Sequence, residues 1–386
     1  MNLETLMPNY NNSILNLINS ILKKFNVETK YKGLSKLDKI LDKEYKNVVL
    51  VVLDGMGERV LNDHVKNGLF KQNEIDTITS VFPSTTTAAM TTYYSGKPPI
   101  ETAWIGWSQY FKEYGKTLDL FPEKDSYTGD KLKINNLPVD NIIGFKTVYE
   151  MIREENEQIK TYEIMPTHCA KKAKITMTAN TIEEMCECIE TLCTARGNKF
   201  IMAYNDNPDG ILHKFGCESE EVNEFMKNTE KEFEKLIEKL KETNTIIIIS
   251  ADHGHNDIKE TIDIVEEEEL QKCLLMPPSV ESRATSFLVK EEMKENFERI
   301  FNEKYGDRFK LYTKEEFLKN GFLGYGEKHE KIDEFLGNYI SVAIDSSRFL
   351  LGTNLSRELK KTDEKKSTHS GLTKNEMEVP LIVFDL

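Results

Sequence analysis

Four short segments, far apart in the 386-residue chain, carry aspartate and histidine at spacings that suit metal binding. Asp209 and His213 stand four residues apart, which places both on one face of a helical turn. Asp252 and His253 are adjacent, so their side chains can diverge toward two different ions. Such ligands, with a hydroxyl group, suit two zinc-like ions that each keep an open position. The candidate ligands are Asp54, Asp209, His213, Asp252, His253 and His369.

A hydroxyl group that such ions could activate lies in the segment Phe82-Pro83-Ser84-Thr85-Thr86-Thr87. Pro83 ends a β-branched run, and Ser84 is predicted to cap a helix that begins at the threonines. The free N–H groups of a helix start favour a phosphate. Taken alone, the segment is typical of an ordinary capped helix. Beside the ligand set, it becomes a candidate for attack on phosphorus.

Two metal ions a few ångströms apart suit an in-line displacement, because one activates the nucleophile and the other steadies the leaving oxygen. Each motif taken singly is more often structural, and only their combination favours a metal site. The remaining histidines lack a setting beside a predicted strand end. We therefore assign His64, His168, His255 and His329 to the surface or to local hydrogen bonds.

The elements that must position the ligands are buried strands. Apolar runs at 47–53, 199–204 and 245–250 each precede candidate ligands, and a last strand at 379–384 follows His369. The carboxyl ends of parallel strands lie at one edge of a sheet, so ligands spread over the chain can converge there. Strands alternate with helices, including long amphipathic ones at 13–25 and 219–242. This alternation predicts an α/β fold: a mainly parallel central sheet with helices on both faces.

Two regions depart from this pattern. Residues 101–140 are aromatic and irregular, which predicts a long connection that is either a functional loop or poorly ordered. After Pro277-Pro278, residues 279–345 are expected to form a small α/β insertion that covers the site like a cap. Residues 1–278 and 346–386 would then form the catalytic domain. Arg283 in the insertion could meet an anionic substrate or form a surface ion pair.

The composition restricts the kinds of molecule that the protein is expected to bind. The net charge of −14 argues against a nucleic acid polymer or an anionic membrane as the main partner. An anionic small molecule would need local positive charge, which bound metal can supply. The chain shows neither a signal peptide nor an apolar run of membrane-spanning length, so we expect a cytoplasmic protein. The six cysteines form no paired zinc-binding motif, and the oligomeric state stays open.

The ordered motifs resemble the type I phosphodiesterase/nucleotide pyrophosphatase branch of the alkaline phosphatase superfamily. They span residues 47 to 384, almost the whole chain. The matching segments are Asp54-Gly55, Phe82 to Thr87 with Ser95-Gly96, Pro208-Asp209-x-x-x-His213, Ser250-Ala-Asp252-His253-Gly254 and His369-Ser-Gly371.

The resemblance implies an alkaline phosphatase-like fold and a threonine nucleophile. Counting from Phe82-Pro83 to Gly96 places the nucleophile at Thr86, with Thr85 and Thr87 as alternatives. The resemblance also implies how the metal ligands divide. One ion would be held by Asp54, Thr86, Asp252 and His253, and the other by Asp209, His213 and His369.

The expected protein is a metal-dependent phosphoric ester hydrolase, similar to phosphodiesterases and nucleotide pyrophosphatases. It would use two divalent ions, Zn²⁺ first and Mn²⁺ or Fe as alternatives, and a phosphothreonine intermediate. Eukaryotic nucleotide pyrophosphatases carry an asparagine three residues after the nucleophile, where this chain has Ala89. A phosphomonoesterase, a phosphonate hydrolase or a phosphomutase on the same metal frame therefore stays open. A metal or nucleotide binder without catalysis is a further alternative.

Overall fold

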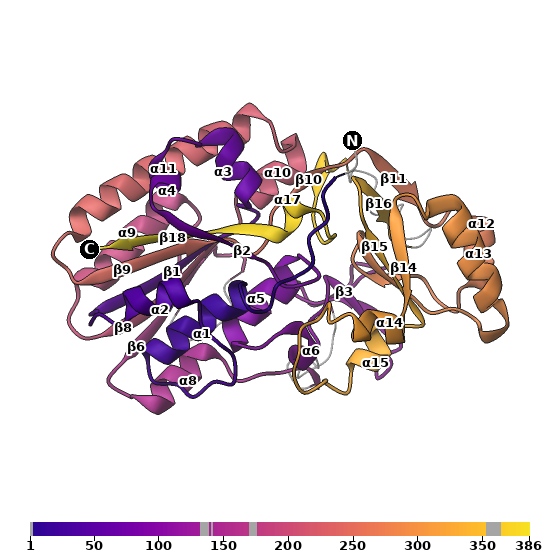
Figure 1. Cartoon of the computed structure of the whole chain (residues 1–386), viewed down its shortest axis with the longest axis horizontal. Coiled ribbons are helices and arrows are strands. Elements are labelled where there is room, and N and C mark those ends of the chain that lie inside the picture. The colour runs from indigo at the N-terminus through magenta and orange to yellow at the C-terminus, as the bar shows by residue number, and fades with distance from the viewer. Residues whose placement is uncertain (1–2, 132–138, 140–141, 170–175, 353–363) are drawn as a thin grey trace.

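The computed structural model of the chain describes residues 3–131, 139, 142–169, 176–352 and 364–386. Two seven-stranded sheets lie beside each other in it (Figure 1). The first sheet follows the order β2-β18-β9-β1-β8-β6-β7. Its strands are β2 (Glu74–Thr79), β18 (Glu378–Asp385), β9 (Thr245–Ser250), β1 (Asn47–Leu53), β8 (Lys199–Asn205), β6 (Lys160–Met165) and β7 (Thr176–Thr178).

Helices cover both faces of the first sheet, which explains why all residues of β1, β8 and β9 are buried. One face carries α1 (Ile14–Lys24), α2 (Ser35–Leu41), α5 (Thr86–Ser95) and α8 (Val148–Glu155) (Figure 1). The other face carries α3 (Glu58–His64), α4 (Leu69–Gln72), α9 (Ile182–Thr194), α10 (Asp209–Phe215) and α11 (Glu220–Leu240). The predicted α/β fold with a mainly parallel, helix-covered sheet is confirmed.

The register of this sheet brings the predicted ligands to one edge. Leu53 of β1 is paired with Asn205 of β8, and Val52 with Ser250 of β9, so the three parallel strands end at one level. Strand β18 runs antiparallel to both β2 and β9. Because β18 begins where its neighbours end, the segment that precedes it, with His369, reaches the same edge.

The second sheet is antiparallel and has the order β14-β15-β13-β12-β3-β4-β5. Its strands are β14 (Phe309–Thr313), β15 (Tyr339–Ala343), β13 (Ala284–Phe287), β12 (Ser279–Val280), β3 (Ser108–Phe111), β4 (Lys116–Asp119) and β5 (Lys124–Asp125). The prediction of an irregular connection at 101–140 is therefore wrong for residues 108–125, although residues 132–138 and 140–141 lie outside the described residues. Of these short strands, β3 pairs with β12, and β4 and β5 join the sheet through β3.

The second sheet thus combines strands from 108–125 with strands from the expected insertion at 279–345. The division of the chain into domains at residues 278 and 346 stays a prediction. Short helices surround this sheet: α6 (Pro99–Thr102), α12 (Glu268–Cys273), η1 (Glu291–Met293), α13 (Lys294–Tyr305), α14 (Lys314–Lys319) and α15 (Ile332–Phe335). Two small ladders, β10 (Asn256–Asp257) with β17 (Ser367–Thr368) and β11 (Glu260–Asp263) with β16 (Ser347–Leu350), and helix α17 (Lys374–Met377) complete the fold.

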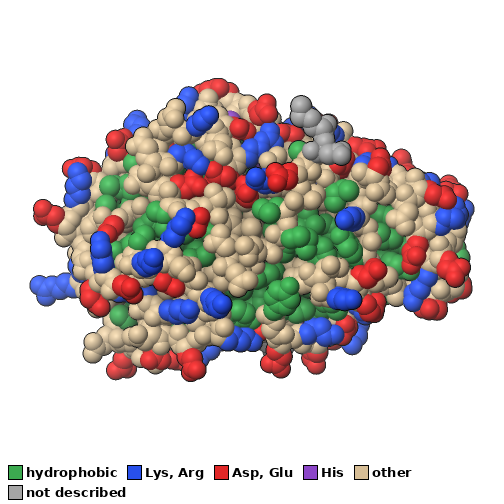
Figure 2. All heavy atoms as spheres, in the orientation of Figure 1, with side chains coloured by type: hydrophobic (Ala, Val, Ile, Leu, Met, Phe, Trp, Pro, Cys, Tyr) green, Lys and Arg blue, Asp and Glu red, His purple; other side chains and the backbone are tan. Residues whose placement is uncertain are grey.

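The visible surface carries acidic and basic side chains in mixture. Figure 2 shows lysine, arginine, aspartate and glutamate interspersed over this face, without a continuous basic area that would fit a polyanion. Among the described helices, none has the length and apolar character that crossing a membrane requires.

Candidate active site

Helix α5 presents the predicted nucleophile at its first residue. Thr85 is the N-cap in extended conformation, and the helix runs from Thr86 to Ser95 before Gly96 ends it at φ +66°. The prediction that Ser84 caps this helix is wrong, because the Ser84 hydroxyl donates to the Gly371 carbonyl at 2.9 Å instead. That contact joins the segment before α5 to the loop that carries His369.

Of the three candidate threonines, Thr86 is the one whose hydroxyl meets predicted ligands. Its Oγ1 lies 3.4 Å from Asp54 Oδ2 and 3.2 Å from His253 Nε2. The Thr85 hydroxyl points elsewhere and donates to Glu281 at 2.7 Å. The buried Thr87 hydroxyl has no hydrogen-bond partner among the described residues. The geometry therefore favours Thr86 over its two neighbours.

The first ligand group surrounds Thr86 with two buried carboxylates, those of Asp54 and Asp252. Oδ1 of Asp252 accepts hydrogen bonds from the backbone N–H groups of Gly55 at 3.0 Å and His253 at 2.9 Å. Its second oxygen, Oδ2, and Oδ1 of Asp54 are buried without a hydrogen-bond partner among the described residues. His253 Nε2 lies 3.4 Å from that Asp54 oxygen and 3.3 Å from that Asp252 oxygen.

The charge and burial of this group suit a bound cation. Burial, with the negative charges of Asp252 and Asp209 adding to it, raises the pKa of Asp54 well above its usual range. Burial likewise raises the pKa of Asp252 to about 7. Buried carboxylate oxygens without partners are costly, and a bound divalent ion would compensate their charge. The residues present therefore fit a metal.

The second ligand group collects three imidazoles around one carboxylate oxygen. Asp209 Oδ1 lies 2.6 Å from His255 Nε2, 3.3 Å from His213 Nε2 and 3.7 Å from His369 Nε2. The ligand atoms of these four residues lie within 4.8 Å of one another. Asp209 and His213 occupy successive turns of α10, as their spacing predicts.

The histidines are oriented for coordination through Nε2. Nδ1 of His213 lies 2.7 Å from the Ser367 carbonyl, and Nδ1 of His369 lies 3.0 Å from the Ser84 carbonyl. A carbonyl only accepts, so each Nδ1 carries the proton and each Nε2 keeps its lone pair. Burial lowers the pKa of His213 to about 3 and holds that of His369 well below its usual range. Both imidazoles are thus in the neutral form that binds metal.

The two groups are adjacent. The rings of His253 and His369 stack with centroids 3.8 Å apart and planes 13° apart. Asp209 belongs to both sets of potential ligand atoms. The structure therefore brings together all seven predicted residues, Asp54, Thr86, Asp209, His213, Asp252, His253 and His369.

Comparison with known families decides the chain's affiliation. The family model of type I phosphodiesterase / nucleotide pyrophosphatase matches residues 48–336, most of the chain. The chain belongs to this family. It is accordingly a hydrolase of phosphoric ester or pyrophosphate bonds, and the family is metal-dependent. No curated protein matches the chain.

Solved structures agree in fold at low sequence identity. Mouse ectonucleotide pyrophosphatase/phosphodiesterase 5, as an inactive threonine-to-alanine variant with AMP, shares 16% identity at a TM-score of 0.62, over 88% of this chain and 87% of that one. Its human counterpart shares 15% identity at 0.63, over 87% of each chain. Phosphonoacetate hydrolase from Sinorhizobium meliloti, with phosphonoformate, shares 15% identity at 0.61, over 87% of this chain and 89% of that one.

His255 lies inside the site of this phosphodiesterase family member: of the two settings predicted for it, the surface is wrong, and hydrogen bonding is what the structure shows. It is 1% exposed, and its Nδ1 lies 3.0 Å from the Ser367 hydroxyl. If that hydroxyl donates, Nε2–H is free to donate to Asp209 Oδ1. The available signal was its position two residues after His253. Tyr204 was also missed: its hydroxyl donates to Asp54 Oδ2 from the end of β8.

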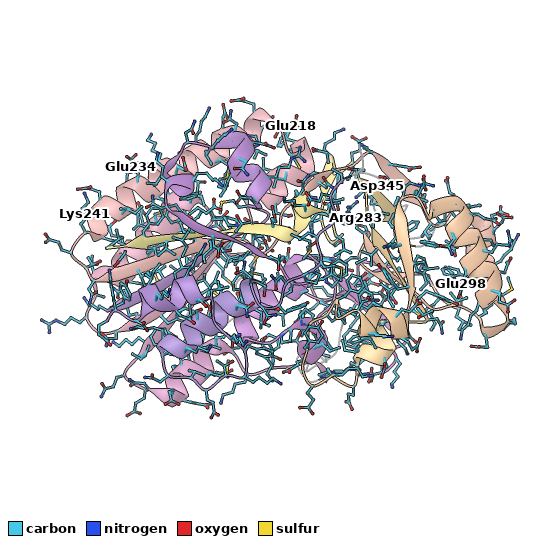
Figure 3. The ribbon with its side chains drawn as sticks, in the orientation of Figure 1. Glu218, Glu234, Lys241, Arg283, Glu298 and Asp345 are labelled. Atoms are coloured by element: carbon cyan, nitrogen blue, oxygen red, sulfur yellow. The ribbon has the colours of Figure 1, made fainter. Side chains whose placement is uncertain are left out.

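Arg283 neither meets the cavity nor lies at the surface, so both sequence-based expectations for it are wrong. Its guanidinium is fully buried and forms a bidentate pair with Glu376, with Nε to Oε1 at 2.7 Å and Nη2 to Oε2 at 2.8 Å. Figure 3 places Arg283 and Asp345 together at the junction between the two sheets. Burial raises the pKa of Glu376, but the Arg283 charge outweighs it and holds that pKa below its usual range.

Close backbone packing explains two motif glycines. Gly55 has φ +75°, and a Cβ there would lie 3.0 Å from the Asp209 Cα. A Cβ on Gly254 would lie 2.0 Å from the Asn375 carbonyl oxygen. Both positions require glycine so that the ligand-bearing turns can approach each other.

A cavity of about 320 Å³ opens above the ligands, between the two sheets. Its floor includes Thr86, Asp209, His213 and His369. Its other walls come from the second sheet and from β16 and the segments around it, and they include Trp107, Ser108, Asp119, Ser126, Tyr127, Glu281, Ser282, Arg348 and Lys365. The volume suits a small phosphate ester.

Proposed function

We propose that this chain is a two-metal phosphoric ester hydrolase in which Thr86 is the nucleophile. The observation that carries the proposal is the Thr86 hydroxyl, which starts α5 and lies 3.4 Å from Asp54 Oδ2 and 3.2 Å from His253 Nε2. The inactive threonine-to-alanine variant of the mouse neighbour supports a threonine role in this fold.

Two ions would divide the ligands as the family resemblance implies. Asp54, Thr86, Asp252 and His253 would hold one, and Asp209, His213 and His369 the other. Imidazole and carboxylate donors suit Zn²⁺, with Mn²⁺ and Fe as alternatives. The unpartnered carboxylate oxygens and the Nε2 lone pairs support this division. When bound, the ions supply the charge that lets a threonine hydroxyl ionise at neutral pH.

The chain's own residues then act on phosphorus. Thr86 Oγ1, after losing its proton, forms a bond to phosphorus while the bond to the leaving oxygen breaks. That oxygen departs with a proton, and residue 86 becomes phosphothreonine. In a second step water attacks the same phosphorus and gives up a proton, the Thr86 oxygen leaves and regains one, and the configuration at phosphorus is retained overall. The backbone N–H of Thr86 at the helix start can donate to a phosphoryl oxygen.

The substrate is a small molecule, and two classes deserve testing. A phosphodiester or pyrophosphate is the first, as the family description suggests. A phosphonate or a phosphomonoester is the second, because the phosphonoacetate hydrolase neighbour binds phosphonoformate on the same fold. Ala89 offers no side-chain donor to a phosphate oxygen, which keeps the second class in view. Location in the cytoplasm stays a prediction from the sequence.

The test compares Thr86→Ala and Thr86→Ser with Thr85→Ala and Thr87→Ala. Each metal-loaded protein is assayed on bis(p-nitrophenyl) phosphate, p-nitrophenyl phosphate, a dinucleotide pyrophosphate and phosphonoacetate. We expect Thr86→Ala to lose about 10³-fold or more in turnover and Thr86→Ser to retain part of it. Acid quenching followed by peptide mass spectrometry should find the phosphoryl group on residue 86. Full turnover by Thr86→Ala, or by protein stripped with a chelator, would refute the proposal.

A further inference from the structure

Glu281 is a buried carboxylate on the cavity wall, and half of its hydrogen-bonding capacity is unused. It follows β12 in the second sheet and is 8% exposed. Its Oε1 accepts from the Thr85 hydroxyl at 2.7 Å and from the Trp107 backbone N–H at 2.6 Å. Its Oε2 has no hydrogen-bond partner among the described residues, while the side chain lines the cavity beside Thr86.

A purely structural role does not account for a carboxylate at this position. Both contacts of Oε1 would be met equally well by the amide oxygen of a glutamine. No described lysine or arginine forms an ion pair with Glu281. Burial raises the pKa of Glu281 to about 7, so its charged form is costly unless a donor meets the second oxygen.

Basic and acidic side chains both line the cavity, and the Arg348 strand lies beside Glu281, because the Phe349 N–H donates to the Ser282 carbonyl at 2.9 Å. Lys365 lies on the ligand side, with Nζ 3.4 Å from His213 Nε2, and Arg348 belongs to β16. The two acidic side chains of the cavity wall, Asp119 of β4 and Glu281, both come from the second sheet. The phosphoryl end of a substrate would lie over the ligands. The organic end can therefore reach the second oxygen of Glu281, a hydrogen-bond acceptor on the wall formed by the second sheet.

We propose that Glu281 Oε2 accepts a hydrogen bond from an ammonium or hydroxyl group on the organic part of the substrate. Glu281 is then a specificity-determining residue that selects phosphate esters carrying a hydrogen-bond donor and rejects those carrying a second anion. This inference rests on the proposed hydrolase function and concerns the same cavity.

The experiment uses p-nitrophenyl phosphodiesters that share one chromophoric leaving group and differ in the second ester group. The second group is propyl, 2-aminoethyl, 3-hydroxypropyl or carboxymethyl. For the metal-loaded wild type, kcat/KM should be roughly ten- to a hundredfold higher for the 2-aminoethyl ester than for the propyl ester. The hydroxypropyl ester should rank between them, and the carboxymethyl ester last.

Glu281→Gln is the sharpest variant, because the amide oxygen can keep both Oε1 contacts while its NH₂ group faces the cavity as a donor. The ratio of 2-aminoethyl to propyl kcat/KM should fall to about one, and the carboxymethyl ester should gain relative to propyl. Asp119→Asn is the matched control, since it removes one negative charge from the same wall. It should keep the wild-type order of substrates.

The outcomes separate this inference from the function on which it rests. If the wild type hydrolyses none of the four esters, the proposed phosphodiesterase activity fails. If it hydrolyses all four at similar kcat/KM, only the role of Glu281 is refuted, and no variant is needed. A Glu281→Gln protein that loses all four rates in parallel would also overturn it, because Glu281 would then act only by holding Thr85. The role of Glu281 would also be refuted if Asp119→Asn lost the preference for the 2-aminoethyl ester while Glu281→Gln kept it.

Discussion

Replacing Arg283 by methionine tests how the second sheet supports the ligands. Besides its bidentate pair with Glu376, Arg283 donates through Nη1 to the Ser347 carbonyl at 2.5 Å and through Nη2 to the Asp345 carbonyl at 2.6 Å. Methionine fills much of the same volume but makes none of these contacts. The substitution therefore removes a charge and its hydrogen bonds without leaving a large cavity.

The consequence passes to His369 through Glu376. That carboxylate also accepts from the Gly371 N–H at 2.8 Å and from the Thr373 N–H at 3.1 Å, and so fixes the loop that holds His369. The same loop contains Ser370 at φ +90°, a conformation that a serine adopts only when its surroundings hold it. Without Arg283, the Glu376 charge stays buried and the loop loses its anchor.

The magnitude follows from these contacts. Removing one partner of a buried ion pair costs about 3–5 kcal/mol in free energy of unfolding. The hydrogen bonds that Glu376 keeps from Gly371 and Thr373 reduce this loss of stability. The Ser347 and Asp345 carbonyls, which lose their donor, increase it. We expect Arg283→Met to lose about 4 kcal/mol. Arg283→Met/Glu376→Gln should recover about 1–2 kcal/mol of that loss, because the buried charge is gone.

Urea unfolding of metal-free protein measures this change, and metal analysis after gel filtration measures retention at the His369 group. Arg283→Met should unfold at lower urea and retain less metal. Arg299→Met is the matched control, because Arg299 forms an exposed pair with Glu303 and should change stability by less than about 0.5 kcal/mol. An Arg283→Met protein within about 1 kcal/mol of the wild type would refute the anchoring role.

Three further outcomes are expected. Burial raises the folded-state pKa of Asp252 from 3.8 to about 7, so between these pH values folded metal-free protein binds a proton that unfolded protein releases. The contribution of Asp252 to stability should therefore fall by about 4 kcal/mol as pH rises from 3.8 to about 7. Urea titrations at several pH values should show this fall in the chelator-treated wild type. In Asp252→Asn the fall should be smaller by the Asp252 part, because the raised pKa values of Asp54 and Glu281 still contribute. His255→Gln should weaken metal affinity about 10- to 100-fold in competition with a chelating dye, while exposed His168→Gln should not. Gly254→Ala should lower the thermal midpoint, because its Cβ would lie 2.0 Å from the Asn375 carbonyl oxygen, and an unchanged midpoint would contradict the packing argument.

The ligand-bearing edge of the first sheet could be predicted from the sequence. Buried parallel strands have continuous apolar runs, so the strand at 47–53 was located to the residue and the strands at 199–205 and 245–250 to within one. Because parallel strands end at one edge of a sheet, Asp54, Asp209 and Asp252 could be placed together from the sequence. The observed register agrees with that placement. The helix at Thr86 followed from Pro83 and Gly96, although the capping residue did not.

The second sheet could not be predicted in the same way. Strands β3, β4 and β5 are two to four residues long, too short for a periodic pattern to emerge. Of the three, β3 pairs with β12, which is more than 160 residues away in the chain, and β4 and β5 join the sheet through β3. The sequence around His255 gives no sign that it belongs to the site, apart from its position two residues after His253. Tyr204, Glu281 and Arg283 act through partners in distant segments, which a single sequence does not reveal.

Glu281 and Arg283 stand two residues apart in one hairpin, and they connect the second sheet to both halves of the site. Glu281 holds Thr85, the neighbour of Thr86, whereas Arg283 holds Glu376 and through it the His369 loop. A cap that merely covered the cavity would need neither contact, because exclusion of water requires only packed surface. Both contacts are buried and polar, so they hold Thr85 and the His369 loop in place in addition to covering the cavity. The second sheet therefore helps to position the start of α5 and the loop that carries His369 as well as to form the cavity above them.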